Sequence, residues 1–395
     1  MLTKGDDYPL HQTSEPIAFA GTDRNFYDRY FFNGYSPDGS IFFAAAMGFY
    51  PQLGIVDASF CVIADGVQHN LRASRRSGGE RLELSVGPIA LNIDVPLEIV
   101  TLRIAPGDWP RAGELRFTGR HFPIEEPRFI RRNGTRLFMD YTRMTQNGHW
   151  SGWLSVGGQR VDVAADWAGT RDRSWGVRPV GASEPQPPPE GNFSQFFWLW
   201  TPCNFEASSL FFHSNDDGAG NAWNRRAVVV SDGGTERHFD AASFDIEWQS
   251  GSRRIAAMTT GLGGERRLSL TPAGPVFAMS GLGYTHPLWG HGLDHGPELA
   301  VAHDSLPETD RGWGNPLAMH VQALVTAELT DGGSVHRGMG VLEQLFVGPH
   351  EPTGRPSTIG SARSDSWALR PTKPSCGPIT GSARSVAISW RSSRR

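Results

Sequence analysis

Residues 169–179, which read GTRDRSWGVRP, contain the carboxyl group best placed for catalysis. Side chains along a strand alternate between its two faces, so Arg171 and Arg173 would lie opposite Asp172. A carboxyl group there could act as a general acid or base, because burial raises its pKa while a neighbouring arginine lowers it. The alternative is a structural salt bridge from Asp172 to Arg171, Arg173 or Arg178.

A histidine-rich stretch, residues 283–296 with the sequence GYTHPLWGHGLDHG, supplies further titratable groups. His286 and His291 could orient water or substrate, as could His149 in the first half of the chain, or they could make only turn contacts. The spacing of His286, His291 and His295 would also suit zinc. Glycines and a proline interrupt any helix that would align these three, and no cysteine supports a metal. We therefore expect no metal and no cofactor.

Glu343 lies in residues 340–346, which read GVLEQLF. In a strand, Val341, Glu343 and Leu345 share a face, which would place a carboxylate among apolar side chains. Such a group is usually paired, often with an arginine. If it is unpaired, its pKa rises and it becomes a candidate acid.

Aromatic side chains lie in or near all of these segments. They could form ordinary core, or they could line a lumen for a hydrophobic ligand of isoprenoid, lipid or polycyclic type. Their π faces can also stabilise a carbocation. The candidate ligand-binding side chains are Trp150, Trp153, Trp175, Trp198, Trp200, Tyr284 and Trp289.

The elements that must position these groups are short strands. The chain has 395 residues with 47 glycines, 28 prolines and 11% aromatic residues, a mixture that favours hairpins over helices. Turn dipeptides such as Asn33-Gly34, Asp65-Gly66 and Gly157-Gly158 separate the apolar runs. About 20 strands and no convincing helix predict an all-β fold of antiparallel barrels or sandwiches.

A proline-rich stretch, residues 183–190, divides the chain, and residues 192–200 then resemble residues 25–32. This weak repeat predicts two copies of one β unit. The expected organisation is an extended lead-in (1–22), a first lipocalin-like β domain (23–182), a linker (183–190), a second lipocalin-like β domain (191–352) and a disordered basic tail (353–395).

Charge and composition exclude several classes of function. The net charge is −4, and residues 355–395 hold eight basic residues and one acidic one, so residues 1–354 carry −11. An acidic body argues against nucleic acid as a partner. Three cysteines in no paired motif suit a reducing cytoplasm. The longest apolar run, 41–46, is too short to cross a bilayer, although contact with a membrane surface stays compatible.

Taken together, the motifs resemble the carotenoid 1,2-hydratase (hydroxyneurosporene synthase) and AttH-like superfamily. Residues 169–179 resemble its D-x-x-W-G-type motif, and residues 283–292 and 340–344 resemble segments of its bacterial members. The resemblance implies two tandem lipocalin-like β-barrels over residues ~23–352. It also implies that Asp172 matches the aspartate thought to protonate an isolated double bond, after which water adds to the tertiary carbocation.

Two positions depart from the hydratase pattern. Thr170 stands where those enzymes have a tyrosine, and His149-Trp150 only approximates their upstream His-x-Trp pair. Other relatives are thought to be cyclases. We therefore expect a cofactor-independent hydratase (a lyase), isomerase or cyclase acting on a hydrophobic small molecule, with Asp172 as proton donor. The alternative is a carrier that binds such a molecule without changing it.

Overall fold

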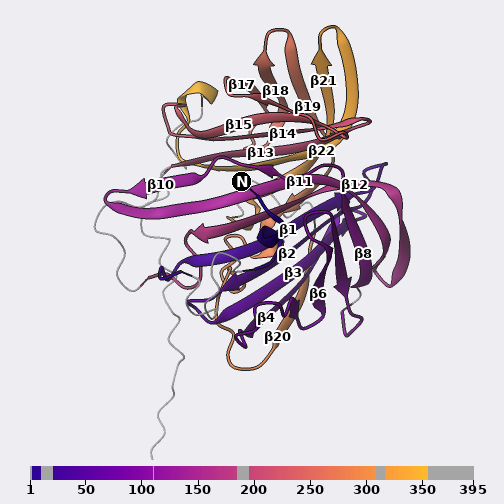
Figure 1. Ribbon diagram of the computed structural model, residues 1–395, viewed down its shortest axis with the longest axis vertical. Helices are drawn as coiled ribbons and strands as arrows, with labels where there is room; N and C mark the ends of the chain where they lie inside the picture. The colour runs from indigo at the N-terminus through magenta and orange to yellow at the C-terminus, as the bar shows by residue number, and fades with distance from the viewer. Residues whose placement is uncertain (1, 10–20, 110, 185–194, 308–315, 355–395) are drawn as a thin grey trace, which may run out of the picture. The chain divides into compact units, whose positions relative to one another are not determined.

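The computed structural model describes residues 2–9, 21–109, 111–184, 195–307 and 316–354, and it confirms the all-β fold (Figure 1). Two curled antiparallel sheets, of 13 and nine strands, form tandem lipocalin-like half-barrels. In the described part of the chain, the helical segments are short 3-10 turns, and no helix is long and apolar enough to cross a membrane.

The first sheet is built almost entirely from the first half of the chain. Its main path runs in the order β20-β4-β3-β2-β1-β12-β11-β8-β7-β6-β5, and β9 and β10 pair with β11. The strands are β1 (Phe26–Tyr35), β2 (Phe42–Tyr50), β3 (Ile55–Ala64), β4 (Val67–Arg76), β5 (Ser85–Val86), β6 (Ile89–Val95), β7 (Ile99–Ile104), β8 (Arg111–Gly119), β9 (Ile124–Glu125), β10 (Phe129–Asn133), β11 (Arg136–Val156), β12 (Gln159–Val177) and β20 (Ala300–Pro307).

The second sheet repeats this arrangement. Its order is β16-β15-β14-β13-β22-β21-β19-β18-β17. Strand by strand, this corresponds to β4-β3-β2-β1-β12-β11-β8-β7-β6 of the first sheet. In the first sheet, β1 lies between β2 and β12. In the second sheet, β13 lies in the same way between β14 and β22. The strands are β13 (Phe196–Phe205), β14 (Ser208–Asp216), β15 (Ala222–Ser231), β16 (Glu236–Phe239), β17 (Ser243–Trp248), β18 (Ile255–Gly263), β19 (Arg266–Ala278), β21 (His320–Asp331) and β22 (Ser334–Val347).

Four strands of the first sheet have no counterpart in the second, namely β5, β9, β10 and β20. Of these, β20 is the most distant along the chain. It comes from the second half of the chain but pairs antiparallel with β4, from Ala300 opposite Ser74 to Pro307 opposite Val67. An ion pair between Arg72 Nη1 and Asp304 Oδ2, 2.6 Å apart, reinforces this edge. The sequence did not predict β20, because its residues, AVAHDSLP, do not alternate between apolar and polar types.

Three apolar cores hold the sheets together. One covers a face of the first sheet and includes Phe43 and Trp150, and another covers a face of the second sheet and includes Phe197 and Leu199. The middle core joins the two sheets, with Phe31 from β1 and Trp200 from β13 among its members. Groups that point from one sheet into this middle core are therefore removed from water.

The long hairpin β11–β12 carries the predicted catalytic segment to this middle layer. Shorter strands were expected here, but β11 and β12 each run unbroken from one end of the hairpin to the other. Their pairing has a bulge between Trp150 and Gly152. Gly176 has φ +135°, and a side chain there would collide with the backbone of Asp140 and Tyr141. The glycine of the D-x-x-W-G-type motif is thus required by close backbone packing.

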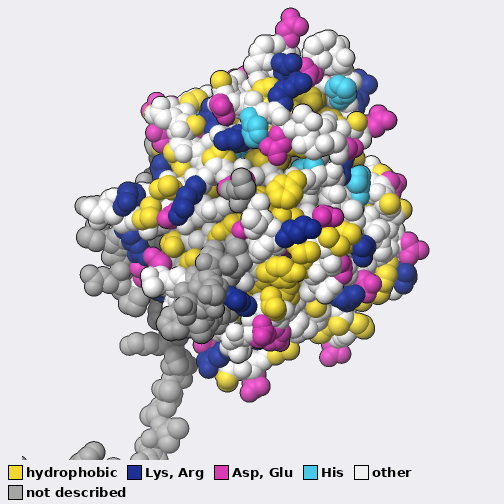
Figure 2. All heavy atoms as spheres, in the orientation of Figure 1, with side chains coloured by type: hydrophobic (Ala, Val, Ile, Leu, Met, Phe, Trp, Pro, Cys, Tyr) yellow, Lys and Arg dark blue, Asp and Glu magenta, His cyan; other side chains and the backbone are white. Residues whose placement is uncertain are grey.

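The outer surface in Figure 2 mixes charges of both signs, with apolar side chains gathered toward the middle of that face. Three parts of the predicted organisation lie largely outside the described residues. These are the lead-in from residue 10 to 20, the linker from 185 to 190 and the tail from 355 onward. The short turn Lys4–Asp7 at the N-terminus is described, and its Asp7 is buried.

Asp7 and Asp28 balance the two arginines of the motif. Arg171 Nη1 donates to Asp7 Oδ1 at 2.9 Å, and Arg173 Nη2 lies 2.9 Å from Asp28 Oδ1. Both arginines are almost fully buried on the face of β12 opposite Asp172, as the alternation predicted. They are therefore paired without using Asp172.

We expect Asp7→Asn to lower the free energy of unfolding by about 3–5 kcal/mol, because it leaves the buried Arg171 guanidinium without a counter-charge. Urea denaturation measures this change. Glu98→Gln is the control, since the Glu98–Lys4 pair is exposed, at 63% and 70%, and should leave the midpoint unchanged. Equal effects of the two substitutions would contradict this assignment.

Candidate functional site

Asp172 lies at the centre of a grid of side chains that point toward the second sheet. The register of β12 places Thr145 of β11 and Phe31 of β1 beside it. The next row toward the end of β12 holds Arg143, Ser174 and Arg29, and the row after that holds Tyr141, Gly176 and Tyr27. Side chains opposite one another on paired strands share a face, so these rows form one surface.

The Asp172 carboxyl is buried and lightly partnered. Its side chain is 14% exposed, and the closest cation is Arg143, with Nη1 4.0 Å from Oδ2. Burial raises the pKa of Asp172 from 3.8 to about 7, and the Glu126 and Glu343 carboxylates reinforce the effect against the opposing Arg143. A carboxyl group with this pKa carries a proton for much of the time near neutral pH, so it can donate one.

Arg143 is committed to Glu126. Its Nε donates to both carboxylate oxygens of Glu126 at 2.9 Å, and Thr145 Oγ1 donates to Glu126 Oε1 at 2.5 Å. The pair is buried, with the two side chains 10% and 0% exposed. Glu126 therefore takes the positive charge that would otherwise hold Asp172 ionised.

Glu343 points at the same region from β22 and accepts three hydrogen bonds. They come from Trp198 Nε1 at 2.7 Å, His320 Nε2 at 2.7 Å and Gln322 Nε2 at 2.6 Å. Although burial opposes ionisation, His320 and these donors hold the pKa of Glu343 below its usual value. Glu343 shares a face with Val341 and Leu345, as the sequence predicted, but the basic side chain beside it is a histidine and not an arginine.

Aromatic rings close the site on the side of the second sheet. The Arg143 guanidinium lies 4.5 Å from the Trp198 ring centre and 5.7 Å from that of Trp200. Phe31, beside Asp172, packs edge-on against Trp200 with ring centres 6.0 Å apart. Trp200 Nε1 and Arg143 Nη2 are buried without a hydrogen-bond partner among the described groups. They are free to bind a polar atom of a ligand.

His291 lies in the same layer, next to two arginines. Its Nε2 is 3.0 Å from the Leu282 carbonyl oxygen, which only a protonated ring nitrogen can contact favourably. Nδ1 then accepts from Arg29 Nη1 at 3.3 Å and from Arg178 Nη2 at 3.4 Å. Burial and these two arginines hold the pKa of His291 well below its usual value, so the ring is neutral.

Of the other predicted residues, the structure brings only Tyr284 to this region, where its ring lies 4.4 Å from His291 and 4.7 Å from His320, centre to centre. His149 pairs with Ala168, four residues along β12 from Asp172, or about 13 Å. His286 Nδ1 accepts from the backbone of Leu288 and Trp289 in a turn. The histidines considered for zinc are thus separately engaged.

The predicted tryptophans divide between the middle core and other positions. Trp198 and Trp200 belong to the middle core, whereas Trp150 lies in the first sheet's own core and donates to the Asn33 carbonyl. The other three lie elsewhere: Trp153 under Arg160, Trp175 against Leu2, Leu97 and Met144, and Trp289 stacked on His295. Sequence reasoning did not single out Glu126, Arg143, Arg29, His320 or Gln322.

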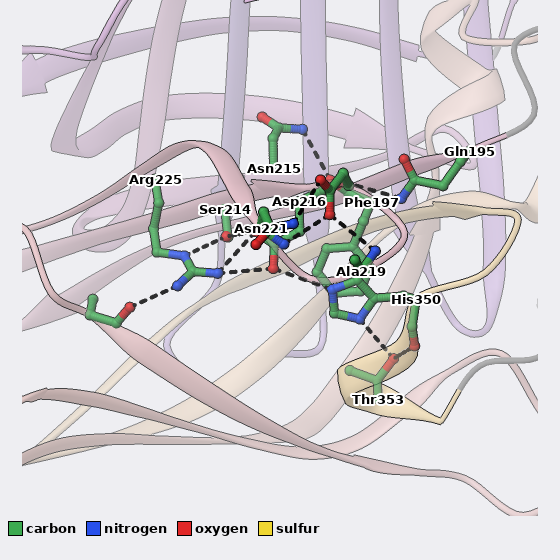
Figure 3. A network of polar contacts seen from close by, with 12 residues as sticks. Gln195, Phe197, Ser214, Asn215, Asp216, Ala219, Asn221, Arg225, His350 and Thr353 are labelled. Carbon is green, nitrogen blue, oxygen red and sulfur yellow. Dashed lines mark hydrogen bonds and ion pairs between the residues drawn. The ribbon is translucent and has the colours of Figure 1, made fainter.

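A second buried network, around Asp216, is a rival candidate (Figure 3). Asp216 accepts from Ser214 Oγ at 2.6 Å and from Arg225 Nη2 at 2.9 Å, and His350 Nε2 lies 3.2 Å from its Oδ2. The ring of His350 stacks on Phe197 at 3.8 Å, and its Nδ1 contacts Thr353 Oγ1 at 3.0 Å. Asp216 and both ring nitrogens of His350 are all engaged, so this network fastens the end of the second sheet.

The sequence matches a family of unknown function (DUF8625) over residues 2–356. The chain belongs to this family. No curated protein matches it significantly. Among solved structures, an AttH-like protein of Nitrosomonas europaea has a TM-score of 0.50 at 15% identity, covering 84% of this chain and 96% of that one. Kievitone hydratase of Nectria haematococca has a TM-score of 0.50 at 10% identity, covering 85% and 93%.

These similarities establish the fold and not the activity. Both proteins fit the superfamily that the sequence motifs resemble, and both extend over nearly the whole described part of this chain. The tandem lipocalin-like architecture expected for this family member is therefore confirmed. A specific kinship with the carotenoid hydratases stays a prediction.

We expect the raised pKa of Asp172 to appear as a pH-dependent stability. Between about pH 4 and 7 the folded state holds the Asp172 proton more often than the unfolded state does, so stability falls as pH rises through this window. Asp172→Asn removes this loss and should gain on the order of a few kcal/mol relative to wild type between pH 5 and pH 8.

Denaturant midpoints at the two pH values measure that difference. Asp162→Asn is the matched control, because Asp162 lies on the same strand but is 82% exposed. Wild type and Asp172→Asn with parallel pH profiles would show that Asp172 titrates as an ordinary carboxyl.

Proposed function

We propose that this protein binds a hydrophobic small molecule between its two sheets and catalyses acid–base chemistry on it without a cofactor. The reaction class is hydration, isomerisation or cyclisation, with Asp172 as the proton donor. The observation that carries the proposal is the Asp172 carboxyl, whose pKa is about 7 and which faces the aromatic middle layer. The name of the structural neighbour kievitone hydratase supports a reaction of this class.

The chemistry follows from the groups around Asp172. The Asp172 O–H bond breaks as its proton adds to a double-bond carbon, which leaves a carbocation on the substrate and a carboxylate on the protein. The π faces of Trp198 and Trp200 and the carboxylates of Glu126 and Glu343 would stabilise that positive charge. Water then adds to the cation and gives up a proton to the Asp172 carboxylate, or that carboxylate removes a proton from a neighbouring carbon of the cation to give an isomer.

Two carboxyls with opposite protonation support this division of roles. Burial and neighbouring anions favour protonated Asp172, while His320, Gln322 and Trp198 keep Glu343 ionised. Enzymes that use one carboxyl group as the acid and another as an electrostatic stabiliser set the two roles through such differences in environment. Asp172 therefore acts as the acid in this proposal and Glu343 as an electrostatic and positioning group.

The first experiment identifies the ligand. Native mass spectrometry of the purified protein, followed by extraction, would identify the compound that occupies the site. Incubating the protein with compounds of the same chemical class would then give a turnover assay. We expect Asp172→Asn to lower turnover by about 100-fold or more while ligand binding and the unfolding midpoint at low pH persist. Asp162→Asn should match wild type in every measurement.

The carrier hypothesis predicts a different outcome. The ligand would be recovered unchanged after incubation, and Asp172→Asn would bind it as wild type does. That result would remove catalysis from the proposal and leave hydrophobic binding.

A further inference from the structure

Two arginines near the end of β12, the buried Arg29 and the half-buried Arg178, have no carboxylate partner among the described residues. Arg29, on β1, is 2% exposed, and its Nη2 donates to the Leu282 carbonyl at 3.1 Å. Arg178 follows the end of β12. In the described part of the chain, neither guanidinium has a carboxylate oxygen within 4.0 Å, whereas Arg143, Arg171 and Arg173 all do.

His291 does not balance their charge. Its neutral ring presents only the Nδ1 lone pair to the two guanidinium groups, at 3.3 and 3.4 Å. This contact orients both arginines toward one point and leaves Arg29 Nε and Arg178 Nε without a hydrogen-bond partner among the described groups. Buried donors without partners are costly, so they indicate a place where an acceptor binds.

The remaining contacts of the two arginines are aromatic. The Arg178 guanidinium carbon lies 4.3 Å from the Tyr27 ring centre, and that of Arg29 lies 4.7 Å from the Tyr284 ring centre. Burial raises the pKa of Tyr27 to about 12, so this tyrosine adds no negative charge. A cation–π contact stabilises a buried cation less than a hydrogen-bonded anion does.

Two nearby carboxyl groups could offset part of this charge. Asp57 accepts from Tyr50 Oη at 3.2 Å and from the Gly292 amide at 2.8 Å, and burial raises its pKa to about 6. Asp172 is the other, and it is neutral whenever it holds the proton that the proposed reaction needs. In the acid-competent state, the Asp57 carboxyl is therefore the one nearby group among the described residues that can offset the two positive charges of Arg29 and Arg178.

We propose that the ligand of this site is a hydrophobic anion whose carboxylate, sulfonate or acidic enolate oxygen binds between Arg29 and Arg178. This inference rests on the proposed function, because it assigns the substrate class of the same site. The anionic oxygen accepts from both guanidinium groups, and the apolar body lies toward the aromatic rings of Trp198 and Trp200. The arrangement fixes the substrate's orientation relative to Asp172.

Two fluorescent probes that differ by one charged group test the proposal. 8-Anilinonaphthalene-1-sulfonate carries a sulfonate, and N-phenyl-1-naphthylamine is its neutral counterpart. We expect the full-length protein to bind the sulfonate at least about tenfold more tightly than the neutral probe. Arg178→Gln and Arg29→Gln should each weaken sulfonate binding about tenfold and leave the neutral probe unchanged.

Further variants separate charge from damage to the fold. Arg178→Lys keeps the positive charge and should retain most of the preference for the sulfonate. Arg160→Gln is the control, since Arg160 also lies over an aromatic ring, that of Trp153 at 4.6 Å, but is 61% exposed. Equal affinity of wild type for both probes, no binding of either probe, or equal effects of Arg160→Gln and Arg178→Gln would overturn the proposal.

Asp172→Asn distinguishes this inference from the proposed function. It should preserve the charge preference of the probes, because the introduced amide is neutral like the protonated acid. If Asp172→Asn abolishes turnover while the probes show no charge preference, the catalytic proposal stands and the anion site fails. If the preference is present but Asp172→Asn leaves turnover intact, the anion site stands and the acid role fails.

Discussion

The site depends on how three neighbouring carboxyl groups, Asp172, Glu126 and Glu343, are partnered. Desolvation disfavours the ionised form of each, so a carboxylate persists only where donors compensate it. Glu126 obtains Arg143 and Thr145, and Glu343 obtains His320, Gln322 and Trp198. Asp172 is left with a guanidinium nitrogen at 4.0 Å, and its two acidic neighbours raise its pKa further. Its reactivity is thus a property of the whole layer.

The internal repeat gives this arrangement its geometry. Asp172 lies on β12 and Glu343 on β22, which are the corresponding last strands of the two sheets. Each carboxyl pairs in register with an aromatic residue of the corresponding first strand, Phe31 or Trp200. Two copies of one strand arrangement therefore present two carboxyl groups to a common layer, where their neighbours raise the pKa of Asp172 and lower that of Glu343.

The sequence was sufficient for the fold class, for the repeat and for the faces of β12, because alternation and turn residues are local signals. It also held a signal for Arg143. If β11 and β12 paired without interruption from the Gly157-Gly158 turn, residue 143 would lie opposite Asp172. The bulge after Trp150 shifts the register by two residues, so Arg143 still lies on the same face of the sheet as Asp172. Glu126 could not be found in this way, because it follows the two-residue strand β9, which is too short to be recognised in the sequence. His320 lies two residues along β21 from Gln322, which pairs with Glu343, so its place follows from the β21–β22 hairpin.

The strand β20 has a consequence for synthesis of the chain. β4 ends at Arg76, but its outer partner begins at Ala300. At the ~5–20 residues per second of translation, the β4 edge of the first sheet stays open for roughly 10 to 45 s, with its backbone groups and Arg72 awaiting their partners. An open edge recruits other strands. The first sheet can therefore reach its full width only after most of the second half of the chain has been made.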